Sequence, residues 1–239
     1  MRIAAPKPPI PRCPPMQLPG GIKKHPPKHQ NDGTFTVATI NDDWATPKKS
    51  NFSWVKADVM LGQETKFAHL RAMDRFKDEK KFGVHQNFKD EAKAGSSIVW
   101  KKSDRIQAGK RGYELGVTPH GAKMLSRYIN FTDMKIDGKN VRMVSVHRPP
   151  PRFKRLWPEF DRALTAFVKN TKGSIIIGMD SNVHNHRALA RMTGLRWHGI
   201  GDSFDGFLTS RDVKFDNLHT LKNGSSDHKP VLARVHIKK

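Results

Sequence analysis

The chain of 239 residues has a single cysteine, Cys13, and no long apolar run. One cysteine cannot form a disulfide within the chain, so nothing favours an oxidising compartment. The first residues, MRIAAPKPPIPRCPP, hold no apolar stretch typical of a signal peptide, and no later stretch is long enough to span a membrane. We therefore expect a soluble intracellular protein located in the cytoplasm.

Acidic residues are also scarce, with 22 Asp and Glu against 44 Lys and Arg, which gives a net charge of +22. Solubility alone needs far less charge than this. Such an excess indicates an acidic partner, with nucleic acid first and an anionic membrane surface second. We predict a monomer that binds nucleic acid, DNA rather than RNA, and that does not associate with membranes.

Proline is concentrated at one end: nine of the 16 prolines lie within the first 27 residues, between Lys, Arg and His. Such a segment forms neither a strand ladder nor a helix, and is typical of a disordered or polyproline-like tail. We predict a tail over residues 1–32 and one domain over residues 33–239, long enough for a sizeable core. Only six of the 44 basic residues fall in the tail, so the positive charge belongs mainly to the domain.

Beyond the tail, apolar runs typical of strands alternate with segments typical of helices, without an internal repeat. Residues 137–140, Asp-Gly-Lys-Asn, separate two strand-like runs and predict a β-hairpin. Mixed strands and helices with a hairpin favour two layers of sheet covered by helices. Strands are expected over residues 34–40, 58–64, 96–102, 127–136, 141–147, 174–180, 203–210 and 230–237, and helices over 50–57, 65–78, 157–170 and 184–194.

Polar groups that can carry chemistry lie at the ends of several predicted strands. One polar strand end is usually only a turn, but five in one domain indicate a site, because a sheet can bring such groups together without burying them unpaired. Hard oxygen donors without thiolates favour Mg²⁺, Mn²⁺ or Ca²⁺ over structural zinc. The five ends are Asn41–Asp43, Gln63–Glu64, His147, Asp180–Asn182 and Ser226–His228.

The order of these motifs resembles that of the endonuclease/exonuclease/phosphatase superfamily, which includes DNase I and exonuclease III. The matching pieces are TINDDW, DVMLGQETK, MVSVHRPP, IIIGMDSN, FDGFLTS and SSDHKPV, and they extend from Thr39 to Val231. GQETK and SDHKPV are the most specific of them. The resemblance implies a four-layered α/β/β/α sandwich, an α/β fold like that of DNase I, and a metal-dependent phosphodiesterase.

The resemblance also implies the metal ligands. Glu64 would be the main carboxylate, Asn41 would lie beside it, and Asp43 and Asp227 would be further ligands. Mg²⁺ would be the ion, or Mn²⁺, with Ca²⁺ as another candidate. An ion held by such carboxylates neutralises charge on a phosphodiester and keeps bound water molecules available for the reaction.

The catalytic groups implied by the resemblance are two imidazoles and their neighbours. His228 would activate water or steady the phosphate, and Asp205 would orient its ring. Asp180 and Asn182 would position the nucleophile and the scissile phosphate. His147 matches the DNase I-like branch, whereas the abasic-site endonucleases usually have Tyr there, so abasic-site specificity is not expected. Glu114 is one candidate partner for His147.

Two basic segments lie near these motifs. Arg148, Arg152, Lys154 and Arg155 follow His147, and we predict that they bind the DNA backbone. Residues 100–112 are predicted to form a second basic loop. A pair of histidines, His184 and His186, is interpreted as surface polar residues rather than zinc ligands, because residues two apart at a helix start point in different directions.

The sequence thus favours a divalent-metal-dependent nuclease that cuts DNA endonucleolytically with low sequence specificity. Two alternatives stay open. One is a phosphatase or phosphodiesterase of the same superfamily that acts on a small or lipid phosphate. The other is a nucleic-acid-binding module without catalytic activity, although such a module has no use for the full set of polar groups.

Overall fold

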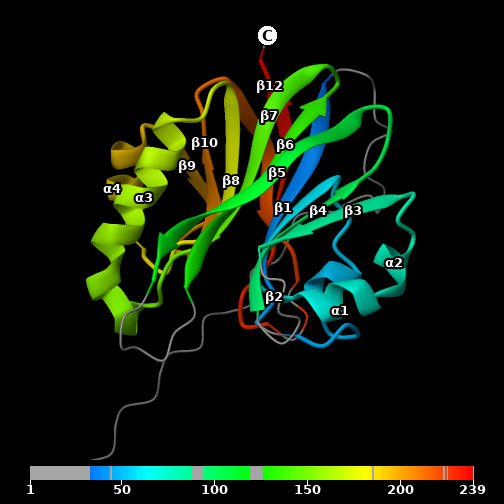
Figure 1. The fold of residues 1–239 in the computed structure, drawn as a ribbon, viewed down its shortest axis with the longest axis horizontal. Coiled ribbons are helices and arrows are strands. Elements are labelled where there is room, and N and C mark those ends of the chain that lie inside the picture. Colours follow the sequence, from blue (N-terminus) through cyan, green and yellow to red (C-terminus); the bar gives the residue numbers. More distant parts are fainter. Residues whose placement is uncertain are drawn as a thin grey trace, which may run out of the picture.

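The computed structural model describes residues 33–43, 45–87, 94–118, 126–184, 186–222, 224 and 226–238. The predicted tail over residues 1–32 lies outside the described residues. Within these ranges, twelve strands form two six-stranded sheets, here named sheet A and sheet B. Figure 1 shows them side by side, with helices on their outer faces.

Sheet A has the strand order β11-β12-β1-β2-β4-β3. Its central strands β1 and β2 are parallel, and the other neighbouring pairs are antiparallel. The strands are β1 Thr34–Asn41, β2 Val59–Lys66, β3 Phe82–Gln86, β4 Ala94–Lys101, β11 Val213–Thr220 and β12 Val231–Ile237.

Sheet B has the order β5-β6-β7-β8-β10-β9, and again one central pair, β7 and β8, is parallel. The predicted hairpin is confirmed: β6 and β7 are joined through Asp137 and Gly138, which both have positive φ as a tight hairpin turn requires. The strands are β5 Ile106–Val117, β6 Arg127–Ile136, β7 Lys139–His147, β8 Ser174–Asp180, β9 Arg196–Gly199 and β10 Asp205–Thr209.

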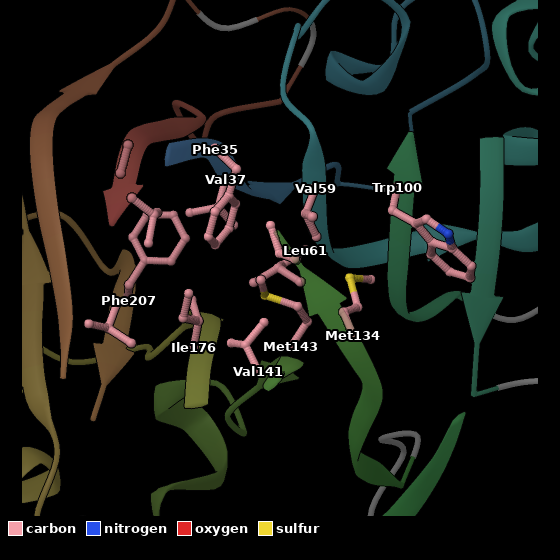
Figure 2. Packing of buried hydrophobic residues seen from close by; sticks show 14 of the residues in the cluster. Phe35, Val37, Val59, Leu61, Trp100, Met134, Val141, Met143, Ile176 and Phe207 are labelled. Carbon is pink, nitrogen blue, oxygen red and sulfur yellow. The ribbon is translucent and has the colours of Figure 1, made fainter. Parts of the chain in front are cut away.

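Three apolar clusters separate four layers. One lies between the sheets and includes Leu61, Met143 and Ile176, which Figure 2 shows packed together. A second packs sheet B against α3 and α4, and a third packs sheet A against α1 and α2. The helical elements are η1 Asn51–Ser53, α1 Phe67–Ala72, α2 Asp74–Lys77, η2 Pro151–Leu156, α3 Trp157–Lys169 and α4 His186–Thr193. The predicted α/β/β/α sandwich is confirmed.

The helix predicted over residues 65–78 is broken at Met73, whose backbone is extended and separates α1 from α2. Its apolar residues Leu70, Met73 and Phe76 are spaced three apart. In a helix of 3.6 residues per turn this spacing rotates each side chain about 60° away from the last. The break lets all three side chains stay buried in the cluster against sheet A.

Residues 100–112, predicted to form a loop, belong largely to strands: they include the end of β4 and the first part of β5. The sequence of β5 does not look like a strand because most of its side chains are exposed. It therefore lacks the alternation of apolar and polar residues that marks a half-buried strand. Within the described ranges, no helix combines the length and apolar character needed to cross a membrane.

The contact between the sheets predicts the effect of a change at Gly178 in β8. A Cβ placed there would lie 2.7 Å from the Leu61 Cβ and 3.0 Å from the Thr39 Oγ1. We expect Gly178→Ala to lower the free energy of unfolding by about 1–3 kcal/mol, because the sheets must move apart. Urea denaturation measures this value.

Gly109→Ala is the matched control, because the nearest atom to its added Cβ, the Asp133 carbonyl oxygen, lies at an ordinary 3.5 Å. It should change stability by no more than about 0.5 kcal/mol. Equal stability of both variants would contradict the close contact at Gly178.

Candidate active site

The ends of the central strands of both sheets meet at one edge of the sandwich. Parallel strands finish at the same edge of a sheet, so Asn41 at the end of β1 comes near Glu64 in β2, and His147 in β7 pairs with Asp180 in β8. Asp205, at the start of the antiparallel β10, pairs with Asp180 from the other side. Strand direction and register thus bring together polar groups that lie far apart in the sequence.

Asp180 lies at the centre of this group and is buried. One carboxylate oxygen accepts a hydrogen bond from Asn41 Nδ2 at 2.9 Å and lies 3.3 Å from His147 Nε2. The other accepts from the Asn182 backbone N–H at 2.9 Å. Burial alone would raise the pKa of Asp180, but its hydrogen bond to His147 and the charges of His147 and His228 lower the pKa to about 2. The carboxylate is therefore ionised at neutral pH.

His147 lies between two carboxylates, since its Nδ1 is 3.5 Å from Glu64 Oε1 and its Nε2 faces Asp180. The suggested partner Glu114 is wrong. Glu114 is exposed in β5 and pairs with Ile129 of β6, a residue on the side of sheet B that faces α3. His147 instead bridges Glu64 of sheet A and Asp180 of sheet B.

The predicted contact between Asp205 and His228 is present, at 2.6 Å from Asp205 Oδ2 to His228 Nδ1. Burial opposes a charged imidazole, but the hydrogen bond and charge of Asp205, together with the charges of Asp180 and Asp227, raise the pKa of His228 to about 9. The ring is therefore an imidazolium at neutral pH. Its Nε2 lies 3.6 Å from the exposed Asp227.

Three of the predicted metal ligands, Asp43, Glu64 and Asp227, are close enough for the charges of Glu64 and Asp227 to act on Asp43. Burial raises the pKa of Asp43 first, and the charges of Glu64 and Asp227 raise it further. A bound cation would relieve this repulsion, and the donors are hard oxygens, so the group fits a divalent ion such as Mg²⁺. The amide oxygen of Asn41 accepts from the Asp43 backbone N–H at 3.1 Å and keeps the two residues together.

Among the described residues, only a different set, Asp180, Asp205 and His228, has ligand atoms that all lie within 4.8 Å of one another, close enough for one ion. Its carboxylates are buried, and His228 Nδ1 is already bonded to Asp205. The first set has exposed carboxylates at Asp43 and Asp227 and suits a hydrated ion better.

Glu64 reaches the site through a local irregularity of β2. The pairing of β2 with β4 shifts between Gly62 and Thr65, and Glu64 has a φ of 52°, in the left-handed region that residues other than glycine seldom adopt. The preceding Gln63 holds this bulge, because its side chain donates to Ser145 Oγ and to the Gly178 carbonyl of sheet B. Strain at this position is typical of a functional residue.

The basic segment after His147 is only partly placed as predicted. Arg152, Lys154 and Arg155 are exposed in η2. Arg148 is buried instead: its guanidinium makes two hydrogen bonds to Asp161 of α3, at 2.9 and 2.5 Å, and lies over the Trp157 ring. A buried cation paired in this way is not available to DNA. The prediction that Arg148 binds the DNA backbone is therefore wrong, and Arg148 instead links the end of β7 to α3.

Arg127 is a cation near the site that was not predicted from the sequence. It begins β6 and is half-buried. Burial lowers the pKa of its guanidinium, while the charges of Glu64 and Asp180 act in the opposite direction. Its Nε has no hydrogen-bond partner among the described residues. The sequence could have revealed this position. Pairing residues backwards from the predicted hairpin turn places residue 127 beside the end of β7, where His147 lies.

The prediction that His186 is a surface residue is wrong. It is buried, its ring stacks on Trp197 at 3.9 Å between centroids, and its Nε2 lies 2.9 Å from Ser181 Oγ. Burial first, and then the charges of His184 and Arg148, lower its pKa to about 4. His184 is exposed, as expected, and contacts the Asp202 carbonyl oxygen.

Burial of neutral His186 predicts a loss of stability in acid. Between its ordinary pKa of 6.5 and its folded pKa of about 4 the unfolded chain binds the extra proton. The free energy of unfolding is therefore fully kept above 6.5 and falls as the pH drops. From pH 7 to 5, wild type should lose about 1–2 kcal/mol more than His186→Phe, because each pH unit below 6.5 costs at most about 1.4 kcal/mol. Urea denaturation at both pH values tests this, and equal losses would contradict it.

No family model and no curated protein matches the sequence. Among solved structures, the chain is similar to an endonuclease/exonuclease/phosphatase protein from Bacteroides vulgatus, with 15% identity over 86% of this chain and 99% of that one and a TM-score of 0.66. For D. rerio TDP2 complexed with a single-strand DNA product, the identity is 12%, the coverage 86% and 100%, and the TM-score 0.69.

A third similar structure is a mannosyl-6-phosphatase from Bacteroides thetaiotaomicron VPI-5482, with 14% identity over 84% of this chain and 99% of that one and a TM-score of 0.64. The three structures agree with the layers and sheets described above. The chain therefore has the fold of the endonuclease/exonuclease/phosphatase proteins, as its motifs predict.

Proposed function

We propose that residues 33–239 form a divalent-metal-dependent phosphodiesterase that cuts the DNA backbone endonucleolytically with low sequence specificity. The observation that carries this proposal is the arrangement around Asp180, with His147 on one side and the Asp205–His228 pair on the other. Proteins of this fold include both a phosphatase and TDP2 bound to a DNA strand, so the fold alone does not choose the substrate. The net charge of +22 favours nucleic acid.

In this proposal Glu64, Asp43, Asp227 and Asn41 hold Mg²⁺, with Mn²⁺ or Ca²⁺ as other ions of the same preference. When bound, the ion neutralises charge on the phosphate and lowers the pKa of water. The left-handed turn at Glu64 keeps its carboxylate directed at the site. Asp43 has the same kind of backbone, with a φ of 41°.

His228 has a clear task as an imidazolium. A cation held by Asp205 can bind the anionic phosphate and give a proton to the oxygen that leaves. Asp205 fixes the orientation of the ring, since its hydrogen bond occupies Nδ1–H and leaves Nε2–H free to face the site. His147 and Asn182 are held around ionised Asp180, and in this proposal they help to position the phosphate.

The strand itself is bound by cations around the site. Arg152, Lys154 and Arg155 of η2 are exposed and follow directly on the loop after His147. Arg127 lies deeper, near Glu64 and Asp180. We assign these four to phosphate contacts and leave out Arg148, which is paired with Asp161.

The direct test is nicking of a supercoiled plasmid in Mg²⁺ and in chelator. We expect wild type to nick only with metal, and Glu64→Gln and His228→Ala to lower the rate by roughly 10²–10⁴-fold. Glu79→Gln and His219→Ala are matched controls, because both residues are exposed and outside the site. They should nick as wild type does.

Two results would count against the proposal. An intact plasmid with both Mg²⁺ and Mn²⁺ would exclude the DNA endonuclease, and turnover of a small phosphate ester would then favour the phosphatase alternative. Wild-type rates for Glu64→Gln would overturn the metal assignment, even if nicking survived.

A further inference from the structure

Next to the site, the edge strand β5 carries an exposed strip made of Arg111, Tyr113 and Leu115. Side chains two apart in a strand share a face. Tyr113 is 49% exposed and Leu115 is 53% exposed, which places them among the few large hydrophobic side chains exposed in the described part of the chain. Neither side chain packs into the hydrophobic core. An exposed apolar group beside a polar site often marks a binding surface.

The strip lies on the side of sheet B that faces sheet A, as the site does. Its neighbour in β6, Asn130, donates a hydrogen bond to the Ser96 carbonyl of sheet A. Tyr113 pairs with Asn130, and Asn130 pairs with Ser145 of β7. Ser145 in turn donates to the Gly62 carbonyl of sheet A. One cross-strand row therefore runs from Tyr113 to β7 on this face.

The next row of paired residues across the strands reaches His147 of the proposed site. Leu115 pairs with Tyr128, and the register of β6 with β7, one step beyond Ile129 and Val146, places Tyr128 beside His147. Neighbouring strands lie about 4.7–4.9 Å apart, so the strip is roughly 10 Å from the strand of His147. A nucleotide next to the scissile phosphate spans such a distance.

The chemistry of the strip suits a nucleobase. The Tyr113 and Tyr128 rings are 5.5 Å apart and meet edge to face at 84°. This contact uses at most one face of the Tyr113 ring, and Tyr113 is 49% exposed. Arg111 is held over the Trp100 ring at 5.2 Å and adds a cation to the same face. The one carboxylate within the strip's sequence, Glu114, points to the other side with Ile129.

We propose that the strip of Arg111, Tyr113 and Leu115 is a stacking platform for an unpaired base of the strand whose phosphate enters the site. Bases in a duplex are stacked on one another, so the platform selects single-stranded or locally unpaired nucleic acid, which includes the locally opened stretches of a supercoiled plasmid. Aromatic groups beside a positively charged groove bind single strands with little sequence preference. This inference rests on the proposed function and adds the substrate class.

The test is a binding measurement in chelator, which separates the platform from catalysis. Fluorescence anisotropy would compare a labelled thymidine strand of about twelve nucleotides with a base-free strand of equal length, which keeps the phosphates but has nothing to stack. Wild type should bind the thymidine strand more tightly. Tyr113→Ala should weaken that binding roughly 5- to 100-fold and leave the base-free strand unaffected.

Two variants complete the design. Tyr113→Trp keeps an aromatic face and should bind the thymidine strand at least as tightly as wild type. Met192→Ala removes a side chain of similar exposure, 43%, from α4 and should behave as wild type with both strands.

The outcomes distinguish this inference from the function on which it rests. If Tyr113→Ala binds both strands as wild type does, or loses both equally, the platform is overturned. Plasmid nicking by wild type would in that case leave the phosphodiesterase standing. If wild type binds neither strand and leaves DNA intact, the nucleic-acid substrate fails, and the platform fails with it.

Discussion

The carboxylate of Asp180 is the group on which the rest of the site depends. It is 2% exposed, and an ion at that depth is stable only where its oxygens are paired. Asn41 supplies one partner from sheet A, while His147 and the Asn182 backbone supply others from sheet B. A shift of one sheet against the other would take the Asn41 hydrogen bond away from this buried charge, so the contact that helps to satisfy Asp180 also fixes the two sheets relative to each other at the site.

A second set of buried polar contacts stabilises the same junction one residue before Glu64. Gln63 reaches from β2 to Ser145 and Gly178 of sheet B, and Ser145 donates back to the Gly62 carbonyl at 2.6 Å. These contacts surround the bulge that turns Glu64 towards the site. A strained backbone is held here by packing on both sides, which is how a fold can keep a reactive carboxylate in one position.

The sequence was most informative where burial leaves a clear pattern. All eight predicted strands exist, and the strands that were missed, β3, β5, β9 and β11, are the four at the sheet edges in the described part of the chain. An edge strand needs no apolar alternation and often carries charge, as Lys110 and Arg111 do in β5. The contact between Asp205 and His228 followed from the motifs. The burial of Arg148 did not, because its partner Asp161 lies on another element and charge alone does not reveal depth.

The most direct measurement is the rate of plasmid nicking by Asp180→Asn in Mg²⁺, together with its unfolding transition. Asparagine keeps the size of the side chain but removes the charge that His147 and His228 face. We predict a rate at least about 100-fold below wild type in a chain that still unfolds cooperatively. A folded Asp180→Asn protein that nicks DNA at the wild-type rate would contradict the central role of this carboxylate.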